Sequence, residues 1–549
     1  MLDTARTLDR YFADWVVKHF SQGHSKKDSE ILMRLAAATS LAVSLKHTCL
    51  DLEVSEHLGE PIFKSLLTGI KVSDVQRVLE PSVSPLTRSV DGQYIWLQKY
   101  HAFDCAVAEN LLAMQRDQRL EIITGGPGTG KTWSAAQRIK SELAKNPHCI
   151  IKLAAPTGKA ANNMMNALMN AGFDSTKHAL KGLTLHALLG LNGNSPKPRH
   201  NCNNPLACDL LIVDEASMID LPMMYRLLDA MPKSATLLLL GDKDQLASVE
   251  AGSVLADICA ALQGDACIRS LTESRRYKNS PEIGALAVAV NAGDVPDMSS
   301  NQCVLLHLSD ARSTWSPAWL AQAATGYGWI AEALKSQLTP LEMLKLQTQF
   351  QVLSALREGP FGVDGINRLI AEKLGHKLNA WYAGQPVMVT QNDHNRKLYN
   401  GDVGMVLACE GQLKACFIVN NEIKAISKAQ MPAFETCYAI TVHKSQGSEY
   451  ERVMIVLPAD AETARVNLVL TRELVYTAIT RAKSKIDLWA GEGVLQAMAQ
   501  KHTANVRLEA FICPLPRGGK QHARMTSQRR GFCYNARRSE SRLLRKPEW

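Results

Sequence analysis

A glycine-rich turn with one lysine and one threonine is the part of this sequence best suited to chemistry. It spans residues 125–132 and directly follows an apolar run at 120–124. Glycines let such a turn adopt positive φ and bring backbone N–H groups against phosphate oxygens, whereas a plain glycine turn without a ligand is the alternative. The pattern predicts a P-loop for ATP, made of Gly125, Gly126, Pro127, Gly128, Thr129, Gly130, Lys131 and Thr132.

The lysine and the threonine of this turn have separate expected roles. Lys131 would reach the β- and γ-phosphates, and Thr132 would ligate Mg²⁺. The residues that follow, 133–144, include helix formers with an apolar period near that of an α-helix. The phosphates would therefore also lie at a helix N-terminus.

Two further apolar runs end in polar side chains that suit phosphoryl transfer. Asp214 and Glu215 follow the run at 210–213, so Asp214 would hold Mg²⁺ and Glu215 would polarise the attacking water. Gln245 follows the run at 237–240 and would sense the γ-phosphate. An Asp-Glu pair after an apolar strand is weak evidence alone. Together with an upstream P-loop it predicts a Walker B site.

The elements that must position these residues are short strands alternating with helices. A buried-type strand at 150–155 leads into a basic turn at 156–161, where ligands bind open α/β sheets. Such alternation predicts an α/β fold with parallel sheets and helices on both faces. A strand at 350–356 and a helix at 364–374 indicate a second sheet of the same kind.

Length and charge set limits on the rest of the chain. The 549 residues favour three or four domains, and no long apolar segment occurs, so we expect a cytoplasmic protein. The net charge is +9, of which residues 514–549 carry +8, from ten basic residues and two glutamates. The remaining chain is close to neutral, so DNA binding cannot be argued from global charge. We expect the basic tail to be disordered, and a nucleic-acid-binding arm is the alternative.

The sequence resembles the RecD family, the alpha subunits of RecBCD (exodeoxyribonuclease V) complexes and superfamily 1B DNA helicases. The resemblance spans roughly residues 8–508, and its most specific parts are residues 204–206 followed by 209–220, 241–253 and 356–362. It implies an ATP-dependent 5′→3′ DNA helicase that acts on double-strand DNA ends with RecB-like and RecC-like partners, in recombinational repair and DNA degradation. No carboxylate cluster typical of a nuclease is found in this chain.

The resemblance also implies roles for particular residues. Arg481 would be an arginine finger that reaches across the cleft between two RecA-like sheets. Arg276, in a run of cations at 271–277, is the better candidate for a second phosphate contact, with a surface ion pair as the alternative. The expected DNA-binding residues are Pro156, Thr157, Lys159, His186, Asn400, His443, Lys444 and Ser445.

These expectations give an order of domains along the chain. Two short strands around an Asn-Gly turn, within 384–406, indicate a small β insertion, SH3-like by resemblance; a plain hairpin without DNA contact is the alternative. The expected domains are an N-terminal helical partner-docking domain at 1–80, a linker at 81–114, RecA-like motor domain 1 at 115–335, motor domain 2 at 345–390 and 434–500, the insertion at 391–433 and the basic tail at 512–549.

The sequence departs from the family before the P-loop. Relatives carry an upstream segment with a glutamine that reads adenine, and here Gln115 and Gln118 lie too close to Gly125 to replace it, while Gln98 matches another family position. Two alternatives to a helicase remain at this point. One is a non-catalytic subunit of the same complex, and the other is a P-loop enzyme that acts on small molecules.

Overall fold

The computed structural model describes most of the chain up to residue 501. The basic tail predicted at 512–549 lies outside the described residues. Described are residues 6–501 except 46, 53–60, 80–84, 90, 174–179, 192–196, 248–251, 297, 308–316, 360, 378–379, 394, 420–421 and 468.

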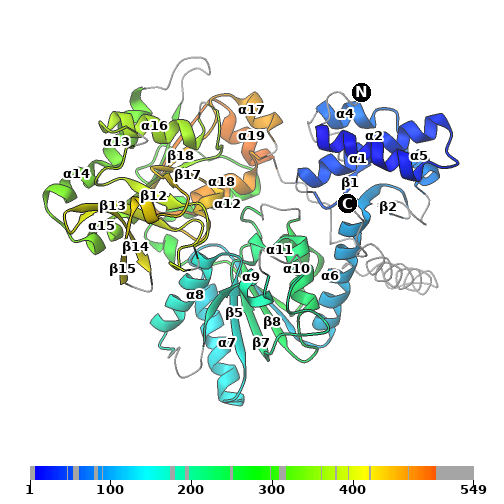
Figure 1. Cartoon of the computed structure of the whole chain (residues 1–549), viewed down its shortest axis with the longest axis horizontal. Helices are drawn as coiled ribbons and strands as arrows, with labels where there is room; N and C mark the ends of the chain where they lie inside the picture. Colours follow the sequence, from blue (N-terminus) through cyan, green and yellow to red (C-terminus); the bar gives the residue numbers. More distant parts are fainter. Residues whose placement is uncertain are drawn as a thin grey trace.

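The first domain is mostly helical, as the apolar spacing predicts. Ser25 begins its longest helix, because the Ser25 Oγ accepts a hydrogen bond from the Asp28 backbone N–H at 3.1 Å. A buried apolar cluster joins the helices to a small antiparallel sheet of order β1-β3-β2. The elements are α1 (Thr7–Phe20), α2 (Lys26–Ser44), β1 (Leu50–Asp51), α4 (Pro61–Leu67), α5 (Val72–Val78), β2 (Leu86–Arg88) and β3 (Tyr94–Leu97). The long helix α6 (Gln98–Arg116) then leads from this domain to the next one (Figure 1).

The second domain is a six-stranded parallel sheet of order β6-β5-β7-β8-β4-β9, with an apolar cluster on each face. Its strands are β4 (Leu120–Gly125), β5 (Ile151–Ala155), β6 (Gly182–Thr184), β7 (Leu210–Val213), β8 (Thr236–Gly241) and β9 (Ile268–Leu271). Its helices are α7 (Lys131–Lys145), α8 (Gly158–Asn170), α9 (Leu185–Leu189), α10 (Leu221–Asp229) and α11 (Val254–Ala261). Because all strands run the same way, the turns after β4, β7 and β8 meet at one edge of the sheet.

The third domain is a five-stranded parallel sheet of order β10-β19-β18-β11-β17, also covered on both faces. Its strands are β10 (Cys303–His307), β11 (Phe350–Ser354), β17 (Ala439–Thr441), β18 (Tyr450–Val456) and β19 (Ala482–Ala490). Its helices are α12 (Pro281–Ala292), α13 (Pro317–Gly326), α14 (Gly328–Lys335), α15 (Pro340–Leu346), α16 (Val363–Lys373), α17 (Ala461–Val466), α18 (Arg472–Ile479) and α19 (Val494–Gln500). The predicted fold class, two parallel α/β sheets in one chain, is confirmed.

The boundary between the two sheets differs from the expected one at residue 335. Helix α12 packs against α18 and α19, and β10 pairs with β19 at the edge of the second sheet. Helices α13 and α14 also contribute to the core of that sheet. The chain therefore crosses to the second sheet near residue 280, because the apolar faces of these elements are buried there.

The small β insertion is a five-stranded antiparallel sheet of order β15-β14-β13-β12-β16 with its own apolar core. It extends a few residues beyond the range expected from the sequence, 391–433, on both sides. Gly401, at φ +91°, makes the predicted Asn-Gly turn before β13. The strands are β12 (Pro386–Val389), β13 (Val403–Cys409), β14 (Gln412–Val419), β15 (Glu422–Ser427) and β16 (Phe434–Thr436).

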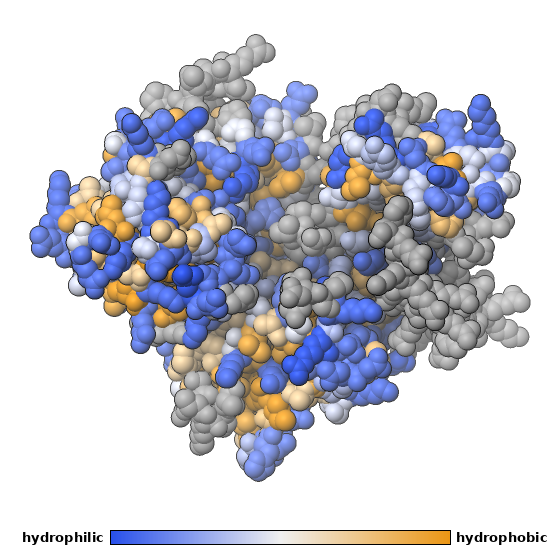
Figure 2. Space-filling model, viewed as in Figure 1, coloured by the Kyte–Doolittle hydropathy of each residue, from blue (hydrophilic) through white to orange (hydrophobic). Residues whose placement is uncertain are grey.

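Hydrophilic residues are more widespread than hydrophobic ones among the coloured residues on the face shown in Figure 2, where smaller hydrophobic patches lie between them. Among the described helices, none combines the length and the hydropathy needed to cross a membrane.

Candidate active site

The P-loop lies between β4 and α7, as predicted. Gly128 and Gly130 have φ values of +73° and +92°, a region that side chains with Cβ rarely adopt. A Cβ at Gly125 would lie 2.5 Å from the Leu271 carbonyl oxygen, so the loop is packed closely against β9. The Lys131 Nζ donates hydrogen bonds to the carbonyl oxygens of Gly125 and Gly126, at 2.5 and 3.1 Å. The lysine therefore lies folded over the concave side of the loop.

The two carboxylates after β7 lie at the same edge of the sheet as the P-loop. Glu215 has φ +51°, and its backbone N–H donates to the Asp214 Oδ1 at 2.8 Å. Desolvation of the carboxyl group is the largest cause that raises the pKa of Asp214, and the negative charge of Glu215 is the next; together they raise it to about 7. The positive charge of Lys131 opposes the rise. A carboxyl group with its charge disfavoured in this way, beside an ammonium group, is suited to receive a divalent cation.

The turn after β8 holds Gln245 beside a buried acid, Asp242, for which the sequence analysis predicted no role. The Gln245 Nε2 donates to the Asp242 Oδ2 at 3.0 Å, and the Tyr476 hydroxyl donates to the same oxygen at 3.0 Å. Burial raises the pKa of Asp242 above its usual range, and Lys131 opposes the rise. A Cβ at Gly126 would lie 3.1 Å from the Tyr476 hydroxyl oxygen. The P-loop, the β8 turn and α18 thus meet at one point.

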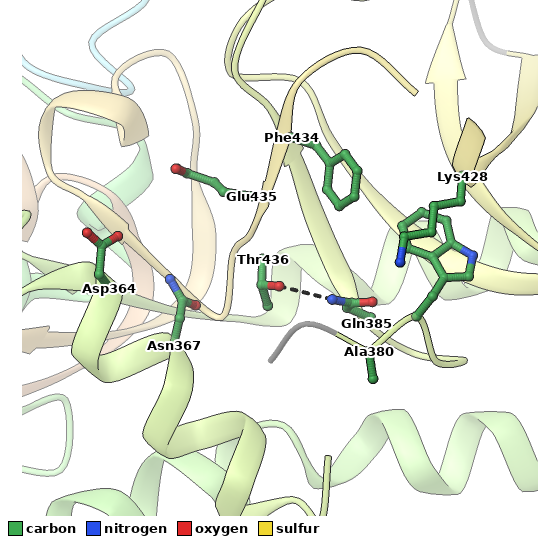
Figure 3. Close-up of a pocket in the computed structure, with 9 residues that line it drawn as sticks. Asp364, Asn367, Ala380, Gln385, Lys428, Phe434, Glu435 and Thr436 are labelled. Carbon is green, nitrogen blue, oxygen red and sulfur yellow. Dashed lines mark hydrogen bonds between the residues drawn. The ribbon is translucent and has the colours of Figure 1, made fainter. Parts of the chain in front are cut away.

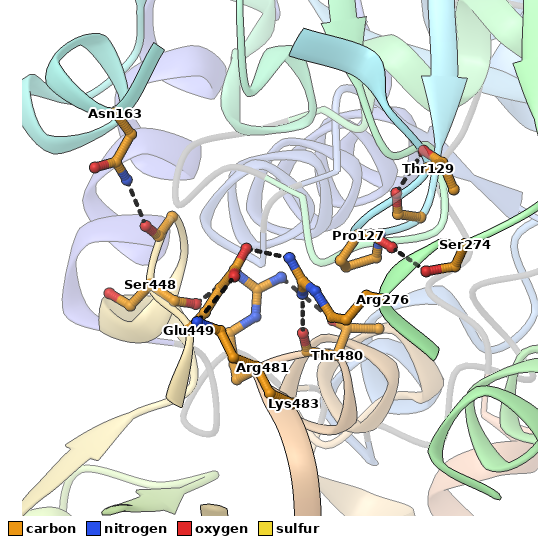
Figure 4. Close-up of polar contacts among 12 residues, drawn as sticks. Pro127, Thr129, Asn163, Ser274, Arg276, Ser448, Glu449, Thr480, Arg481 and Lys483 are labelled. Carbon is orange, nitrogen blue, oxygen red and sulfur yellow. Dashed lines mark hydrogen bonds and ion pairs between the residues drawn. The ribbon is translucent and has the colours of Figure 1, made fainter. Parts of the chain in front are cut away.

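The two predicted phosphate-binding arginines come from different domains and lie side by side where these domains meet (Figure 4). Arg276 follows β9; its Nη2 forms an ion pair with Glu449, and its Nη1 donates to the Thr480 carbonyl oxygen at 3.3 Å. A Cβ at Gly128 would lie 2.5 Å from the Arg276 Cβ, so this arginine borders the P-loop. Arg481 follows α18, is 3% exposed, and its Nη1 donates to the Ser448 carbonyl oxygen at 3.3 Å. Both guanidinium groups therefore contact the same small region of the second domain: Arg276 contacts Glu449 and Thr480, and Arg481 contacts Ser448 and Thr480.

Three turns that carry predicted DNA-binding residues converge beside this region. The Lys159 Nζ donates to the Ser448 Oγ at 2.5 Å, and the Asn163 Nδ2 donates to the Gly447 carbonyl oxygen at 2.9 Å. Desolvation lowers the pKa of Lys159. A Cβ at Gly158 would lie 2.9 Å from the Tyr399 ring, so the start of α8 also contacts the insertion.

Lys444 lies in an ion-pair network at the rim of a pocket. Its Nζ contacts the Glu435 Oε1 at 2.6 Å, and Arg357 contacts the other oxygen of Glu435 at 2.9 Å. The pocket, of about 400 Å³, lies between α16 and the antiparallel sheet (Figure 3). Glu435 thus lies between the pocket and the two cations. The lining residues are Asp364, Asn367, Ala380, Trp381, Gln385, Lys428, Phe434, Glu435 and Thr436.

Other predicted DNA-binding residues have local structural roles or lie apart. The Thr157 Oγ1 caps α8 by accepting from the Ala160 N–H at 3.2 Å, directly after the half-buried Pro156. The buried Ser445 hydroxyl donates to the Val442 carbonyl oxygen at 2.7 Å. Asn400 and His186 are exposed, on the turn before β13 and on α9, and His443 begins a short helical turn, η6 (His443–Ser445).

The upstream glutamines lie away from the P-loop. The Gln115 Nε2 donates to the Asp265 Oδ2 at 2.7 Å, and Gln118 is exposed with φ +55°. Both residues precede β4, whereas the P-loop follows it, so they lie toward the opposite edge of the sheet. Neither glutamine is placed to take over the reading of a base.

Two residues at the site lie in sequence patterns that could have predicted a functional role for them. Asp242 is an acid directly after a buried strand, the same pattern that led to Asp214. Tyr476 is an aromatic residue on the helix that precedes Arg481. The pairing of Glu449 with Arg276 has no local signal, because the two residues are far apart in the sequence and meet only across the cleft.

The geometry defines a class of protein. A P-loop, two carboxylates after another strand of the same sheet and two arginines where the two parallel-sheet domains meet are the parts of an ATP-driven motor with two RecA-like domains. Two family models agree with this class, an AAA domain at residues 109–251 and a UvrD-like helicase C-terminal domain at residues 436–488.

The chain belongs to the RecD family. It is 36% identical over 440 residues to the RecBCD enzyme subunit RecD of Haemophilus influenzae, covering 68% of this chain and 67% of the relative. It is 37% identical over 420 residues to the same subunit of Mycolicibacterium smegmatis, covering 70% of each chain. The ATP-dependent RecD2 DNA helicase of Deinococcus radiodurans is 32% identical over 374 residues, or 67% of this chain and 46% of that protein. The family resemblance noted in the sequence is thereby confirmed.

Solved structures of helicases also match with weak similarity. Pif1 helicase from Bacteroides, in complex with ADP-AlF3 and ssDNA, is 19% identical with a TM-score of 0.38, covering 71% of this chain and 93% of that chain. A score this low adds nothing to the fold assignment, which rests on the two parallel sheets.

Proposed function

We propose that this chain is the ATP-hydrolysing, DNA-translocating helicase subunit of a RecBCD-type enzyme that processes double-strand DNA ends. One observation carries the proposal: the P-loop, Asp214 and Glu215 lie at the edge of the first sheet where the second domain approaches, with Tyr476 beside Gly126 and Asp242 and with Glu449 paired to Arg276. A non-catalytic subunit would not need all of these groups. The predicted cytoplasmic location stays a prediction.

The groups that would hold ATP and Mg²⁺ fit them. The loop of residues 125–130 would surround the phosphates with backbone N–H groups, and Lys131 would leave the loop carbonyls for the β- and γ-phosphates. Thr132 and Asp214 would hold Mg²⁺, which neutralises charge on the phosphates when bound. A divalent cation would also favour the ionised form of Asp214, whose pKa is raised without it.

Hydrolysis would be tied to closure of the two sheets. Glu215 would orient and polarise the attacking water, with Gln245 beside it. Arg276 and Arg481 would leave Glu449 and the Ser448 carbonyl for the γ-phosphate, where an arginine of this kind contributes about 10³–10⁵ in rate. Opening after hydrolysis would change the contact of Lys159 with Ser448 of the second domain. The grip of Lys159 and Lys444 on DNA would change with it, and alternating strong and weak grip would give net motion.

Strand displacement tests the proposed function directly. The full chain, alone and with RecB- and RecC-type partners, is given duplexes that carry a single-stranded tail at either the 5′ or the 3′ end. We expect ATP-dependent displacement from the 5′-tailed duplex, since the family resemblance implies 5′→3′ movement. Displacement from neither substrate, by a chain that folds and binds ATP, would leave the proposal without support.

Nucleotide choice should be relaxed in this chain. A glutamine can pair with both the donor and the acceptor of the adenine edge, and here Gln115 is bound to Asp265 instead. If two lost hydrogen bonds are worth about 0.5–1.5 kcal/mol each, the preference for ATP over GTP should be roughly ten- to a hundredfold smaller than in a relative with the upstream glutamine. Values of kcat/KM for both nucleotides at saturating DNA measure it. A strong ATP preference would mean that another group reads the base.

The N-terminal domain is proposed to dock onto the partner subunits. Leu8, Tyr11 and Trp15 form an exposed apolar stripe on α1 and are 70%, 71% and 46% exposed. Replacing all three with serine should lower co-purification with RecB- and RecC-type partners at least about tenfold, the loss expected for apolar anchors of an interface. The matched control replaces Asp14 and Lys18, which are exposed on the same helix. Full stoichiometric recovery of the stripe variant would place the docking surface elsewhere.

A further inference from the structure

The turn after β8 belongs to the first sheet but is held by the second domain. The Leu246 backbone N–H donates to the Thr477 Oγ1 at 2.8 Å, and the Gln446 Nε2 donates to the Leu246 carbonyl oxygen at 2.9 Å. The Leu246 side chain is 8% exposed and packs in the apolar cluster of the second sheet. Residues 242–246 should therefore follow movements of the second domain.

Asp242 connects that domain to Gln245 through a single oxygen atom. Its Oδ2 accepts from the Tyr476 hydroxyl and from the Gln245 Nε2, each at 3.0 Å. The three residues are 1%, 7% and 6% exposed, so little water competes for these hydrogen bonds. A carboxylate accepts hydrogen bonds and cannot donate them, so the amide nitrogen of Gln245 must face it. The Oε1 of Gln245 is then the atom left for another donor.

Helix α18 places this contact next to the arginine finger. Tyr476 and Thr477 lie on α18, which ends at Ile479, and Arg481 follows two residues later. The Arg481 Nε donates to the Thr477 carbonyl oxygen at 3.0 Å, so the arginine is tied to the same helical turn. A movement of α18 would therefore shift Arg481 and the β8 turn together.

We propose that Tyr476 is a positioning residue for ATP hydrolysis, whose hydroxyl acts through Asp242 to orient Gln245 toward the attacking water. The inference rests on the proposed function. With its amide nitrogen held by Asp242, Gln245 offers its Oε1 as the acceptor for a proton of that water. Gln446, next to the predicted DNA-binding residues Lys444 and Ser445, holds the same turn, so DNA binding and water orientation share one structural connection.

The substitution Tyr476→Phe removes the hydroxyl and keeps the ring. In the full chain we expect kcat for DNA-stimulated ATP hydrolysis to fall about tenfold, the effect of one hydrogen bond to a charged group. The KM for ATP and the affinity for single-stranded DNA should stay unchanged, because in the described part of the chain the hydroxyl donates its hydrogen bond to Asp242 and not to the phosphate-binding loop or a predicted DNA-binding residue. A role in folding alone would lower the melting temperature without this selective loss of kcat.

Tyr277→Phe is the matched control. Tyr277 borders the same cleft, and its hydroxyl is buried without a hydrogen-bond partner in the described part of the chain. Its removal should leave kcat unchanged. If Tyr476→Phe hydrolyses ATP as fast as wild type and Tyr277→Phe, the positioning role is excluded.

A double-mutant cycle tests whether the hydroxyl acts through Asp242. Asp242→Ala removes the oxygen that accepts both hydrogen bonds and should lower kcat, and adding Tyr476→Phe should lower it no further, because both changes break the same connection. Effects that multiply would show that Tyr476 acts by another route. A wild-type chain without DNA-stimulated hydrolysis would contradict the proposed function, whereas a stimulated wild type with an unaffected Tyr476→Phe variant would contradict only this inference.

Discussion

Replacing Lys131 with glutamine should reduce ATP hydrolysis at least about 10²–10³-fold, the loss typical of one preorganised charge-stabilising donor. Among the described residues, the Lys131 Nζ donates hydrogen bonds to the carbonyl oxygens of Gly125 and Gly126, so the folded chain loses little when the lysine is replaced. Nucleotide binding should also weaken, because no other side chain of the P-loop carries a charge. Steady-state hydrolysis and equilibrium binding of a fluorescent ATP analogue measure the two effects.

The control for this variant is Lys145→Gln, at the exposed end of the same helix. It removes the same charge from α7 without touching the loop, so hydrolysis should be unchanged. Melting temperatures of both variants should match wild type. Near-wild-type hydrolysis by a folded Lys131→Gln protein would show that the P-loop lysine is not needed for ATP hydrolysis.

Replacing Glu215 with glutamine should separate ATP binding from turnover. The amide keeps the size of the side chain but cannot accept a proton, so hydrolysis should fall about 10²–10⁴-fold, the usual contribution of a general base. ATP affinity should persist, since the P-loop and Lys131 are intact. A single-turnover experiment should show ATP retained on the protein and little phosphate released.

The contrast between the two variants is the informative result. Lys131→Gln should lose binding together with turnover, whereas Glu215→Gln should lose turnover alone. If Glu215→Gln releases phosphate at the wild-type rate, another group polarises the water. Asp242, a buried acid at the same edge of the sheet, would then be the next residue to test.

Local patterns predicted the parts of the site that follow single strands. The P-loop, Asp214 and Gln245 each come directly after a buried apolar run, and parallel strands bring such positions to one edge of a sheet. This prediction does not require the order of the strands, because parallel strands in any order place their C-terminal ends at the same edge of the sheet.

Features that depend on distant partners could not be predicted in this way. Residues 281–335 carry ordinary helical and strand patterns. Contacts with distant elements assign them to the second sheet, namely the packing of α12 on α18 and the pairing of β10 with β19. The contacts of Glu449 with Arg276 and of Tyr476 with Asp242 join residues from different domains. Their residue types are also common in surface ion pairs and in cores, so no local pattern pairs them.

ATP hydrolysis by the purified full chain, with and without saturating single-stranded DNA, tests the central claim most directly. The cleft places Lys131, Glu215 and the arginines beside turns predicted to contact DNA, so wild type should hydrolyse ATP faster when DNA is added. The Lys131→Gln protein should stay slow in both conditions. A folded wild-type chain whose hydrolysis is the same with and without DNA, alone and with its partner subunits, would contradict the account of a DNA-driven motor.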